Sequence, residues 1–342
     1  MHILNYMSIN KPDFIITIGA SAGGLNAMTE VIAQLPEEIN AAVFIVLHLS
    51  KVGLGDFLVH RLQKYTGYSC KIAKNGDKIE ANHVYIAPPD QHLLVRENEV
   101  VLGQGPAENR WRPSIDVLFR SAAVSYGSKV IGIILTGYLN DGTSGMWAIK
   151  RSGGHCIVQD PNEAEYPDMP LSVLESMEVD HCVSLRQMGE TVSAIISSSK
   201  TEGEKPKNNA PAEVVKEAEI AEKVATGMDN VEQVGTPALL ACPDCGGGLW
   251  SVDNDAIKRY RCHVGHSYTE KDLLIKQSES LEATLWVALR MMEERRSLLT
   301  RISTDESKKG LLRMGAIYQK RASDLEEHIG KLKELLFSAK ND

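Results

Sequence analysis

The chain has 342 residues, of which 43% are hydrophobic and 24% charged, and its formal net charge is −8. The length predicts two domains, since a domain usually holds about 100–200 residues, and the acidic balance argues against nucleic acid as a partner. No apolar run approaches the ~20 residues that a membrane span needs, and the start of the chain lacks the features of a secretory signal, so we expect a cytoplasmic protein without direct membrane insertion.

Residues 11–198 alternate short β-branched apolar runs with segments of helical length. This alternation is typical of a mainly parallel sheet that helices wrap on both faces. The candidate strands read FIITIGA, AAVFIVLHL, KIAKNGDKI, HVYIAPP, EVVLGQG, VIGIILTG and GHCIVQD. Most of them are too apolar for a solvated face, so the sheet is expected to be buried on both sides. We therefore predict a doubly wound α/β domain.

A glycine-rich turn, GASAGG at residues 19–24, joins the first strand to the first helix. Such a turn can cradle a pyrophosphate, or it can act as a nucleophile elbow that lifts a serine hydroxyl clear of the sheet. A dinucleotide site needs an acidic residue near the end of the second strand, whereas this strand ends in His48. Neutral imidazole is well matched to deprotonating a serine at neutral pH. We therefore predict Ser21 as a nucleophile and His48 as its base.

A carboxylate is the third group that such a pair needs, because it orients the histidine and stabilises the protonated ring. Asp141 follows another buried strand in the loop NDG, at the same carboxyl edge of the sheet as Ser21 and His48. An NDG sequence by itself is also typical of an ordinary turn. Asp116 and Asp160 are rival carboxylates that spacing does not exclude. We predict Asp141 as the orienting acid.

Residues 199–235 shift to charged and small polar residues with few aromatics. This composition predicts a flexible linker between two modules. The alternative is a short helix, because four small or apolar residues recur with helical spacing. They are Val214, Ala218, Ala221 and Ala225.

A cluster of cysteines marks the next module, residues 236–272. It contains C-x2-C, sixteen intervening residues and then C-x3-H, a spacing typical of two zinc knuckles. The candidate ligands are Cys242, Cys245, Cys262 and His266. His263 is the alternative fourth ligand. Three thiolates and one imidazole close a tetrahedron with no open position for water, so we predict a structural zinc ion and no cofactor for catalysis.

Residues 273–342 carry two long helical patterns and predict an antiparallel α-helical hairpin. Apolar residues recur three and four apart at Leu274, Leu281, Leu285, Ala288, Met292 and Leu299, and again at Leu311, Met314, Tyr318, Leu325, Ile329, Leu332 and Leu336. The segment STDESKKG lies between the patterns, where Ser303 and Asp305 can cap the second helix. Oligomerisation through these helices is the alternative. The candidates for a face that docks an unknown regulator, or for core positions of the hairpin, are Trp286, Met291 and Met292.

Six blocks occur in order along the first domain: IGASAGG, VLHLS, VYIAPPDQHLLV, RPSIDVLFRSAA, GIILTGYLNDGTSGM and GGHCIVQDPNEAEYPDMPLSVL. Together they resemble the catalytic domain of the chemotaxis protein-glutamate methylesterases, the CheB family. The resemblance implies the CheB catalytic-domain fold, with the nucleophile, the base and the orienting acid at Ser21, His48 and Asp141. The backbone N–H groups that it implies for an oxyanion hole belong to Ala22 and Tyr138.

The activity that the resemblance implies is hydrolysis of glutamyl methyl esters on a protein substrate. In that reaction Ser21 attacks the ester as His48 takes its proton, methanol leaves, and water then releases the glutamate from an acyl-enzyme. The implied partner is a methylated chemoreceptor-like protein in a chemosensory pathway, and glutamine deamidation is an implied side activity. Gln91 and Arg112 lie in the third and fourth blocks and are candidates for substrate contacts or for ordinary structural hydrogen bonds.

Three departures from the family pattern bear on this expectation. The fifth block usually reads TGMGNDG, whereas TGYLNDG here puts bulky Tyr138 and Leu139 beside the implied oxyanion hole. The second block usually continues His-Met-Pro but here reads His-Leu-Ser. Members that act in chemotaxis carry a receiver domain ahead of the esterase, whereas here the turn begins at residue 19, so we expect constitutive activity or control by another partner.

Two other functions remain open at this stage. A signalling scaffold would follow if the altered fifth block disabled the oxyanion hole. A nucleotide-binding oxidoreductase is disfavoured because no acidic residue ends the second strand.

Residues 236–272 and the segment after them resemble an extension that some stand-alone family members carry, with GHSYT leading into SLEATLWVALRMMEER.

Overall fold

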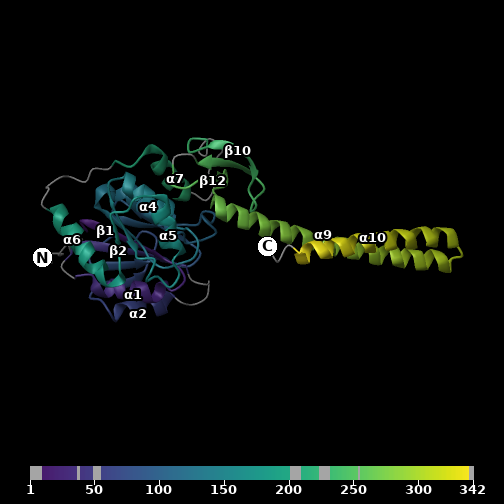
Figure 1. Ribbon diagram of the computed structural model, residues 1–342, viewed down its shortest axis with the longest axis horizontal. Coiled ribbons are helices and arrows are strands. Elements are labelled where there is room, and N and C mark those ends of the chain that lie inside the picture. Colours follow the sequence, from purple (N-terminus) through teal and green to yellow (C-terminus); the bar gives the residue numbers. More distant parts are fainter. Residues whose placement is uncertain are drawn as a thin grey trace, which may run out of the picture. The chain divides into compact units, whose positions relative to one another are not determined.

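The computed structural model describes residues 10–36, 39–48, 55–200, 209–222, 232–252 and 255–338. The chain forms two compact units, which divide between residues 272 and 273. The first unit holds the large sheet, its covering helices and a second, smaller sheet, and the second unit is helical (Figure 1). None of the described helices is both long enough and apolar enough to cross a membrane.

Seven parallel strands form the central sheet, in the order β3-β4-β2-β1-β7-β8-β9. Their bounds are β1 Phe14–Ala20, β2 Ala41–Leu47, β3 Ser69–Ile72, β4 His83–Ile86, β7 Val130–Ile134, β8 His155–Gln159 and β9 His181–Val183. Strand β1 lies between β2 and β7, so the order of the strands reverses at β1. In open α/β sheets such a switch point, at the carboxyl ends of the strands, is where ligands bind. The doubly wound parallel sheet predicted from the sequence is confirmed.

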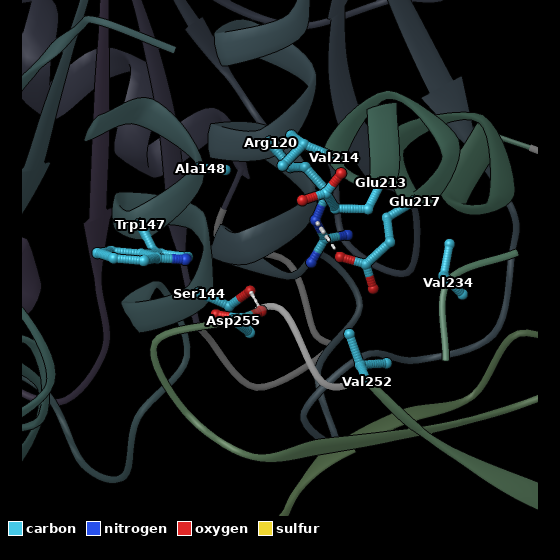
Figure 2. A pocket seen from close by; sticks show the side chains of 10 residues that line it. All are labelled: Arg120, Ser144, Trp147, Ala148, Glu213, Val214, Glu217, Val234, Val252 and Asp255. Carbon is cyan, nitrogen blue, oxygen red and sulfur yellow. Dashed lines mark hydrogen bonds and ion pairs between the residues drawn. The ribbon is translucent and has the colours of Figure 1, made fainter. Parts of the chain in front are cut away.

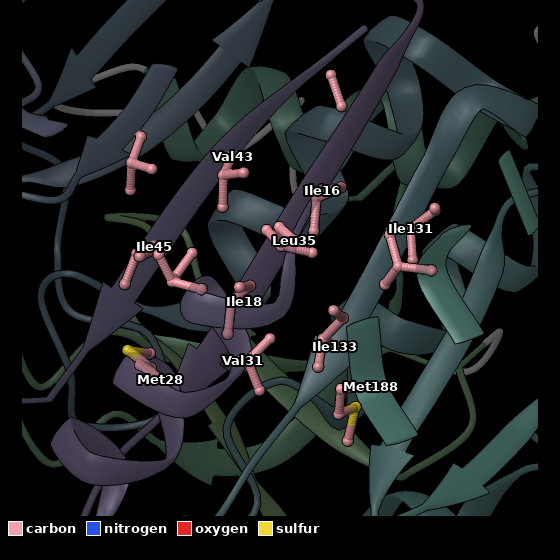
Figure 3. Close-up of a cluster of buried hydrophobic side chains, with 14 of the residues drawn as sticks. Ile16, Ile18, Met28, Val31, Leu35, Val43, Ile45, Ile131, Ile133 and Met188 are labelled. Carbon is pink, nitrogen blue, oxygen red and sulfur yellow. The ribbon is translucent and has the colours of Figure 1, made fainter. Parts of the chain in front are cut away.

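Helices cover both faces of this sheet. One face carries α1 (Gly24–Gln34), α2 (Gly55–Gln63) and α6 (Met188–Lys200), and the other carries α3 (Ile115–Tyr126), α4 (Thr143–Arg151) and α5 (Asp168–Ser176). Short 3₁₀ turns lie at Gly127–Lys129 and Leu185–Gln187. Successive side chains of a strand point to opposite faces, and accordingly Ile16 and Ile18 join the first of these cores while Ile15 joins the second. Figure 3 shows the first core, with Met28 and Val31 of α1 beside Ile18.

One predicted strand lies outside the central sheet. The run EVVLGQG forms β6 (Glu99–Gly103), which pairs antiparallel with β5 (His92–Arg96) as a separate two-stranded ribbon. Only Glu97 and Asn98 separate the two strands, and a connection this short makes a hairpin, whereas a parallel pair needs a long crossover. The three-residue strand β9, which the sequence analysis did not predict, takes the edge position instead.

The segment predicted as a flexible linker, residues 199–235, contains helix α7 (Ala212–Glu222). This helix packs against α3 and buries Val214, Glu217, Ile220 and Ala221. Over residues 212–222 the chain is therefore a packed helix, which is the alternative that the spacing of its small residues allowed, while Ala225 lies outside the described residues. Because the buried face of α7 includes the charged Glu217, its sequence lacks a continuous apolar face, and composition alone therefore favours a linker.

The cysteine-rich segment folds into a four-stranded antiparallel sheet, hereafter the cysteine module. Its strands follow the chain order β10 (Thr236–Ala241), β11 (Gly248–Val252), β12 (Arg259–Cys262) and β13 (Ser267–Thr269). The module belongs to the same compact unit as the α/β domain. Hydrogen bonds and ion pairs described below join the two.

The second unit is an antiparallel pair of helices, α9 (Glu270–Lys308) and α10 (Leu312–Ser338). Leu289, Ile329 and Leu336 are buried between them, and Glu293 pairs with Lys333 at 2.7 Å across the pair. The apolar pattern predicts that STDESKKG lies between the helices, but the residues of this segment up to Lys308 belong to α9. Because the segment contains neither proline nor glycine before Gly310, the helix continues through it, and the turn follows at Gly310, whose φ is +82°.

Candidate active site

The glycine-rich turn presents Ser21 at the end of β1. Gly23 caps α1 with φ +73°, a backbone conformation that glycine adopts without strain. A Cβ on Gly24 would lie 2.6 Å from Ala20 Cβ and 2.7 Å from Leu47 Cδ1, so the glycine permits the helix to start directly against the strand ends. The Ser21 N–H donates to Thr136 O at 3.0 Å, and the residue is partly exposed. The turn thus offers its hydroxyl at the switch point of the sheet.

His48 is the neighbour of Ser21 on the adjacent strand. Ala20 and Leu47 are paired in the parallel register of β1 and β2, so Ser21 and His48 are the next residues of the two strands. The imidazole Nε2 lies 3.0 Å from Asp141 Oδ2, and both side chains are almost fully buried. Among the described residues, the buried Nδ1 atom has no hydrogen-bond partner. The ring therefore meets Asp141 with one nitrogen and has the other available.

The Asp141 carboxylate is held by donors from the start of α3 and from the loop before it. It accepts hydrogen bonds from Ile115 N at 2.7 Å, Ser114 Oγ at 2.9 Å and Asn109 Nδ2 at 2.9 Å. Burial by itself raises the pKa of the Asp141 carboxyl, but the histidine and these donors outweigh it and hold the pKa below its usual value. Asp141 is thus an ionised, fixed acceptor facing His48.

The two rival carboxylates occupy other positions. Asp116 accepts hydrogen bonds from Gly142 N at 3.0 Å and Gly145 N at 2.6 Å, and so ties α3 to the start of α4. Burial and the nearby Asp141 raise the pKa of Asp116 to about 7. Asp160 accepts from Asn162 in the turn after β8. Among the three aspartates, Asp141 is the one that the structure brings to His48.

Three residues that the sequence does not reveal lie around this site: Trp111 and Asn109 in the loop between β6 and α3, and His92 at the start of β5. The Trp111 ring stacks on the His48 imidazole, with centroids 4.0 Å apart and an angle of 9° between the planes. Asn109, at φ +49°, donates from one amide nitrogen to both Asp116 and Asp141. His92 lies beneath the loop, where its Nε2 pairs with Pro106 O at 2.9 Å and its Nδ1 accepts from Ser114 N at 3.3 Å. Burial lowers the pKa of His92, which keeps that ring neutral.

The backbone N–H groups predicted for an oxyanion hole belong to Ala22, which follows Ser21, and to Tyr138, in the loop after β7. Within the described chain, neither Ala22 N–H nor Tyr138 N–H donates to a backbone carbonyl. A Cβ added to Gly137 would lie 2.8 Å from Ser21 Cβ, so the segment that leads into Tyr138 runs directly against the serine. The Tyr138 side chain is 53% exposed and packs on the Tyr166 ring at 4.5 Å. Its bulk is therefore accommodated at the surface.

The two predicted substrate contacts, Gln91 and Arg112, lie in another part of the loop region. The Arg112 guanidinium donates to Asp90 Oδ1 at 2.8 and 3.1 Å and to Gly105 O at 2.8 Å. Gln91 follows Asp90 in the chain. Within the part of the chain that the structure describes, neither side chain is hydrogen-bonded to Ser21, and a role in substrate binding stays a prediction.

Comparison with protein families gives one match along the α/β domain. The family model described as CheB methylesterase matches residues 16–192, which is more than half of the chain. The chain belongs to the CheB methylesterase family. A relative from Leptospira interrogans, named putative protein-glutamate methylesterase/protein-glutamine glutaminase, is 40% identical over 176 residues, which cover 51% of this chain and 91% of the relative.

Two further comparisons agree with CheB membership. A protein-glutamate methylesterase/protein-glutamine glutaminase from Pectobacterium atrosepticum is 35% identical over 202 residues, covering 58% of this chain and 57% of that protein. The crystal structure of the Thermotoga maritima CheB methylesterase catalytic domain superposes with a TM-score of 0.51 at 32% identity, covering 54% of this chain and 98% of that domain. The α/β domain is therefore the CheB catalytic fold.

The cysteine module lies outside the CheB match and holds four side chains with metal-ligand chemistry. The ligand atoms of Cys242, Cys245, Cys262 and His266 all lie within 4.8 Å of one another. Tetrahedral zinc with Zn–S bonds of about 2.3 Å requires ligand atoms about 3.8 Å apart. The Cys245 and Cys262 sulfurs are 3.7 Å apart, and His266 Nδ1 is 3.7 Å from Cys242 Sγ and 3.4 Å from Cys262 Sγ, which fits such a site. His263, the alternative ligand, lies against Gly247 and outside this group.

Proposed function

We propose that this protein is a serine hydrolase that removes methyl groups from glutamyl methyl esters of a protein substrate. The observation that carries the proposal is the contact of His48 with Asp141, with Ser21 at the end of the neighbouring strand β1, in a chain of the CheB family. The names of the relatives, protein-glutamate methylesterase/protein-glutamine glutaminase, support the same reaction.

The acylation step follows from the orientation of the His48 ring. Because Nε2 faces the Asp141 carboxylate, the proton of the neutral imidazole sits on Nε2, and Nδ1 carries the free lone pair. Nδ1 accepts the Ser21 proton as Oγ attacks the ester carbonyl. The N–H groups of Ala22 and Tyr138 stabilise the oxyanion, and such donors contribute about 3–4 kcal/mol each in related chemistry. Protonated His48 then donates to the departing methoxide, which leaves as methanol.

The second half of the reaction regenerates the serine. His48 takes a proton from water, which attacks the acyl-enzyme, and the glutamate carboxylate and the Ser21 hydroxyl are restored. The same residues hydrolyse a glutamine side chain when ammonia replaces methanol as the leaving group. Stacking of Trp111 holds the imidazole in its plane between the two partners through both steps.

The substrate class and setting are those of chemosensory signalling. The proposed partner is a methylated chemoreceptor-like protein, and the proposed compartment is the cytoplasm, where three metal-binding thiols stay reduced.

The metal that Cys242, Cys245, Cys262 and His266 would hold is zinc, which closes the two knuckles and stabilises the cysteine module. Such a closed site supplies folding energy and leaves the chemistry to the α/β domain. A regulator that docks on the C-terminal segment belongs to the same proposal.

Methanol release from a methyl-labelled chemoreceptor fragment tests the proposed function. We expect release by the intact protein and a loss on the order of 10⁴-fold or more in Ser21→Ala, because removing the nucleophile of such a triad removes most of its rate enhancement. Ser193→Ala is the matched control, since that hydroxyl donates to Gly189 O within α6, away from the proposed site. Release by Ser21→Ala at the rate of the control would contradict the proposal. Absence of release from every methylated receptor tried would favour the scaffold function.

A further inference from the structure

Two loops that carry the proposed active site are also held by the cysteine module. Asn109 N donates to Ser267 O at 2.8 Å, which ties the loop bearing Trp111 to β13. On the second loop Asn140, the neighbour of Asp141, donates from Nδ2 to Thr269 Oγ1 at 2.9 Å. Thr269 caps α9 by accepting from Asp272 N, and both side chains are buried. The ends of β13 thus contact two residues beside Asp141: Asn140, which precedes it in the chain, and Asn109, which donates to its carboxylate.

A buried ionic network joins the same surfaces. Glu108, next to Asn109, pairs with Arg261 of β12 at 2.7 Å and with Arg120 of α3 at 3.2 Å. Glu217 of α7 pairs with Arg259 of β12 at 2.7 Å and with Arg120 at 3.4 Å. Each of these side chains is at most 6% exposed. Charges this deeply buried are tolerated only in a closely defined geometry, so they fix how the module meets the α/β domain.

A small cavity beside this network shows how close the packing is. Figure 2 shows Arg120 and Glu217 facing each other and Ser144 of α4 facing Asp255, which precedes β12. The cavity volume is about 10 Å³, near the space that one water molecule needs. Asp255 also pairs with Arg259. The contact between module and domain is therefore continuous from α4 to the loop that carries Trp111.

The metal-binding knuckle, residues 262–266, connects the two anchoring residues. Arg261 directly precedes Cys262, and Ser267 directly follows His266. Gly265 N donates to Cys262 O at 3.0 Å, and Arg261 Nη1 donates to Gly265 O at 3.1 Å. A Cβ on Gly265 would lie 3.3 Å from Pro106, so the knuckle also packs on the active-site loop. The geometry of the knuckle thus sets the spacing between Arg261, which pairs with Glu108, and Ser267, which accepts from Asn109.

We propose that the knuckle 262–266 and its flanking residues Arg261 and Ser267 are positioning residues of the esterase site. They hold the loop of Asn109 and Trp111, and through it the alignment of Asp141 with His48. This inference rests on the proposed serine hydrolase function. Ser21 remains partly exposed with the module in this position, so the module does not cover the proposed nucleophile, and we expect displacement of the module to lower the rate.

The test compares Arg261→Met with a control that is destabilised elsewhere. The readouts are kcat and KM for methanol release, the rate at which a fluorophosphonate labels Ser21, and the metal content. We expect Arg261→Met to lose about 10- to 100-fold in kcat and in labelling rate with a smaller change in KM, because a misplaced catalytic group costs that much. Arg261→Lys keeps the charge and recovers part of the rate. Val192→Ala, buried in α6 on the other face of the sheet, labels at the rate of the unmodified protein.

Removal of the metal from the unmodified protein is the second arm and needs no substitution. We expect the labelling rate to fall with metal content, its pH profile to shift as the His48–Asp141 pair loses alignment, and both to recover when Zn²⁺ is added back. Circular dichroism establishes that the α/β domain stays folded. If Arg261→Met does not fold, the metal-removal experiment alone tests the inference. Unchanged or faster labelling of folded, metal-free protein overturns the inference, and faster labelling would identify the module as a lid.

The labelling readout separates this inference from the proposed substrate. If the unmodified protein is labelled at Ser21 but releases no methanol, the ester substrate is wrong, and the dependence of labelling on Arg261 and metal still decides the inference. If the unmodified protein is neither labelled nor active, the serine hydrolase function and the inference that rests on it both fail.

Discussion

At the scale of single residues, one amide holds two acidic side chains together. Asn109 donates to Asp116 and Asp141, which are both buried and would otherwise repel each other. The two carboxyls differ because burial and its neighbour raise the pKa of Asp116 to about 7, while His48 and several donors hold the pKa of Asp141 low. Pairs of titratable groups pushed apart in this way are typical of catalytic sites.

Asn109→Asp should therefore destabilise the folded protein more than Asn109→Gly does. Glycine at position 109 removes the amide but adopts the φ of +49° without strain. Aspartate at this position adds a third carboxyl beside Asp116 and Asp141, and their proximity raises the pKa of the new carboxyl. A carboxyl with a raised pKa in the folded state contributes stability below its usual pKa and loses it as the pH rises through the raised value. We expect the stability deficit of Asn109→Asp relative to Asn109→Gly to grow between about pH 5 and pH 8, because the new carboxyl shares the surroundings that raise the pKa of Asp116 to about 7. Thermal unfolding across this range checks it, and a deficit independent of pH would contradict it.

The residues found from the sequence and those missed differ in a physical way. Ser21, His48 and Asp141 each follow a buried apolar strand, and the carboxyl ends of parallel strands share one edge, so local pattern and general topology place them together. Trp111 and Asn109 act through a loop whose path depends on His92 and on β13, neither of which lies near them in the sequence. Their only local signal is an asparagine, a residue that tolerates positive φ.

At the scale of elements, α7 is a structural component although its composition resembles a linker. Its buried face includes Glu217, which balances Arg120 and Arg259, and the arginines hold the pKa of Glu217 well below its usual value. A charged residue on the inner face breaks the apolar periodicity that sequence analysis depends on. Six of the seven central strands show the opposite case, since most of them are continuous apolar runs that predict a buried parallel sheet, whereas the short edge strand β9 gives no such signal.

Glu217→Gln should cost about 3–5 kcal/mol in the free energy of unfolding, because it removes one of the carboxylates that balance three buried arginines and leaves a positive charge uncompensated. Glu213→Gln on the same helix is the matched control. Its partner Arg151 lies at 2.9 Å, and both side chains are about 30% exposed, so the pair should contribute about 0–1 kcal/mol. Urea unfolding followed by circular dichroism measures both. Equal losses in the two variants would contradict the structural role of the network.

At the scale of the whole molecule, the helical hairpin is a unit separate from the esterase and its cysteine module. The hairpin has its own core at Leu289, Ile329 and Leu336, and its own ion pairs, such as Arg296 with Glu326 at 2.7 Å. Apolar periodicity in its sequence predicts the pairing of the helices, whereas the exact turn depends on Gly310. By contrast, the inclusion of the cysteine module in the catalytic unit rests on the long-range pairing of Glu108 with Arg261, which no local pattern encodes.

This division predicts that the hairpin can be destabilised without loss of esterase activity. Ile329→Ala removes a side chain that is 3% exposed and should cost the hairpin about 2–5 kcal/mol. Leu335→Ala, at a position 54% exposed, should change stability by less than about 0.5 kcal/mol. Thermal scans should show an earlier helical transition in Ile329→Ala alone, while methanol release at 25 °C stays the same in both variants. If Ile329→Ala lowered the rate of methanol release in proportion to its loss of helix, the hairpin would have to be part of the catalytic unit.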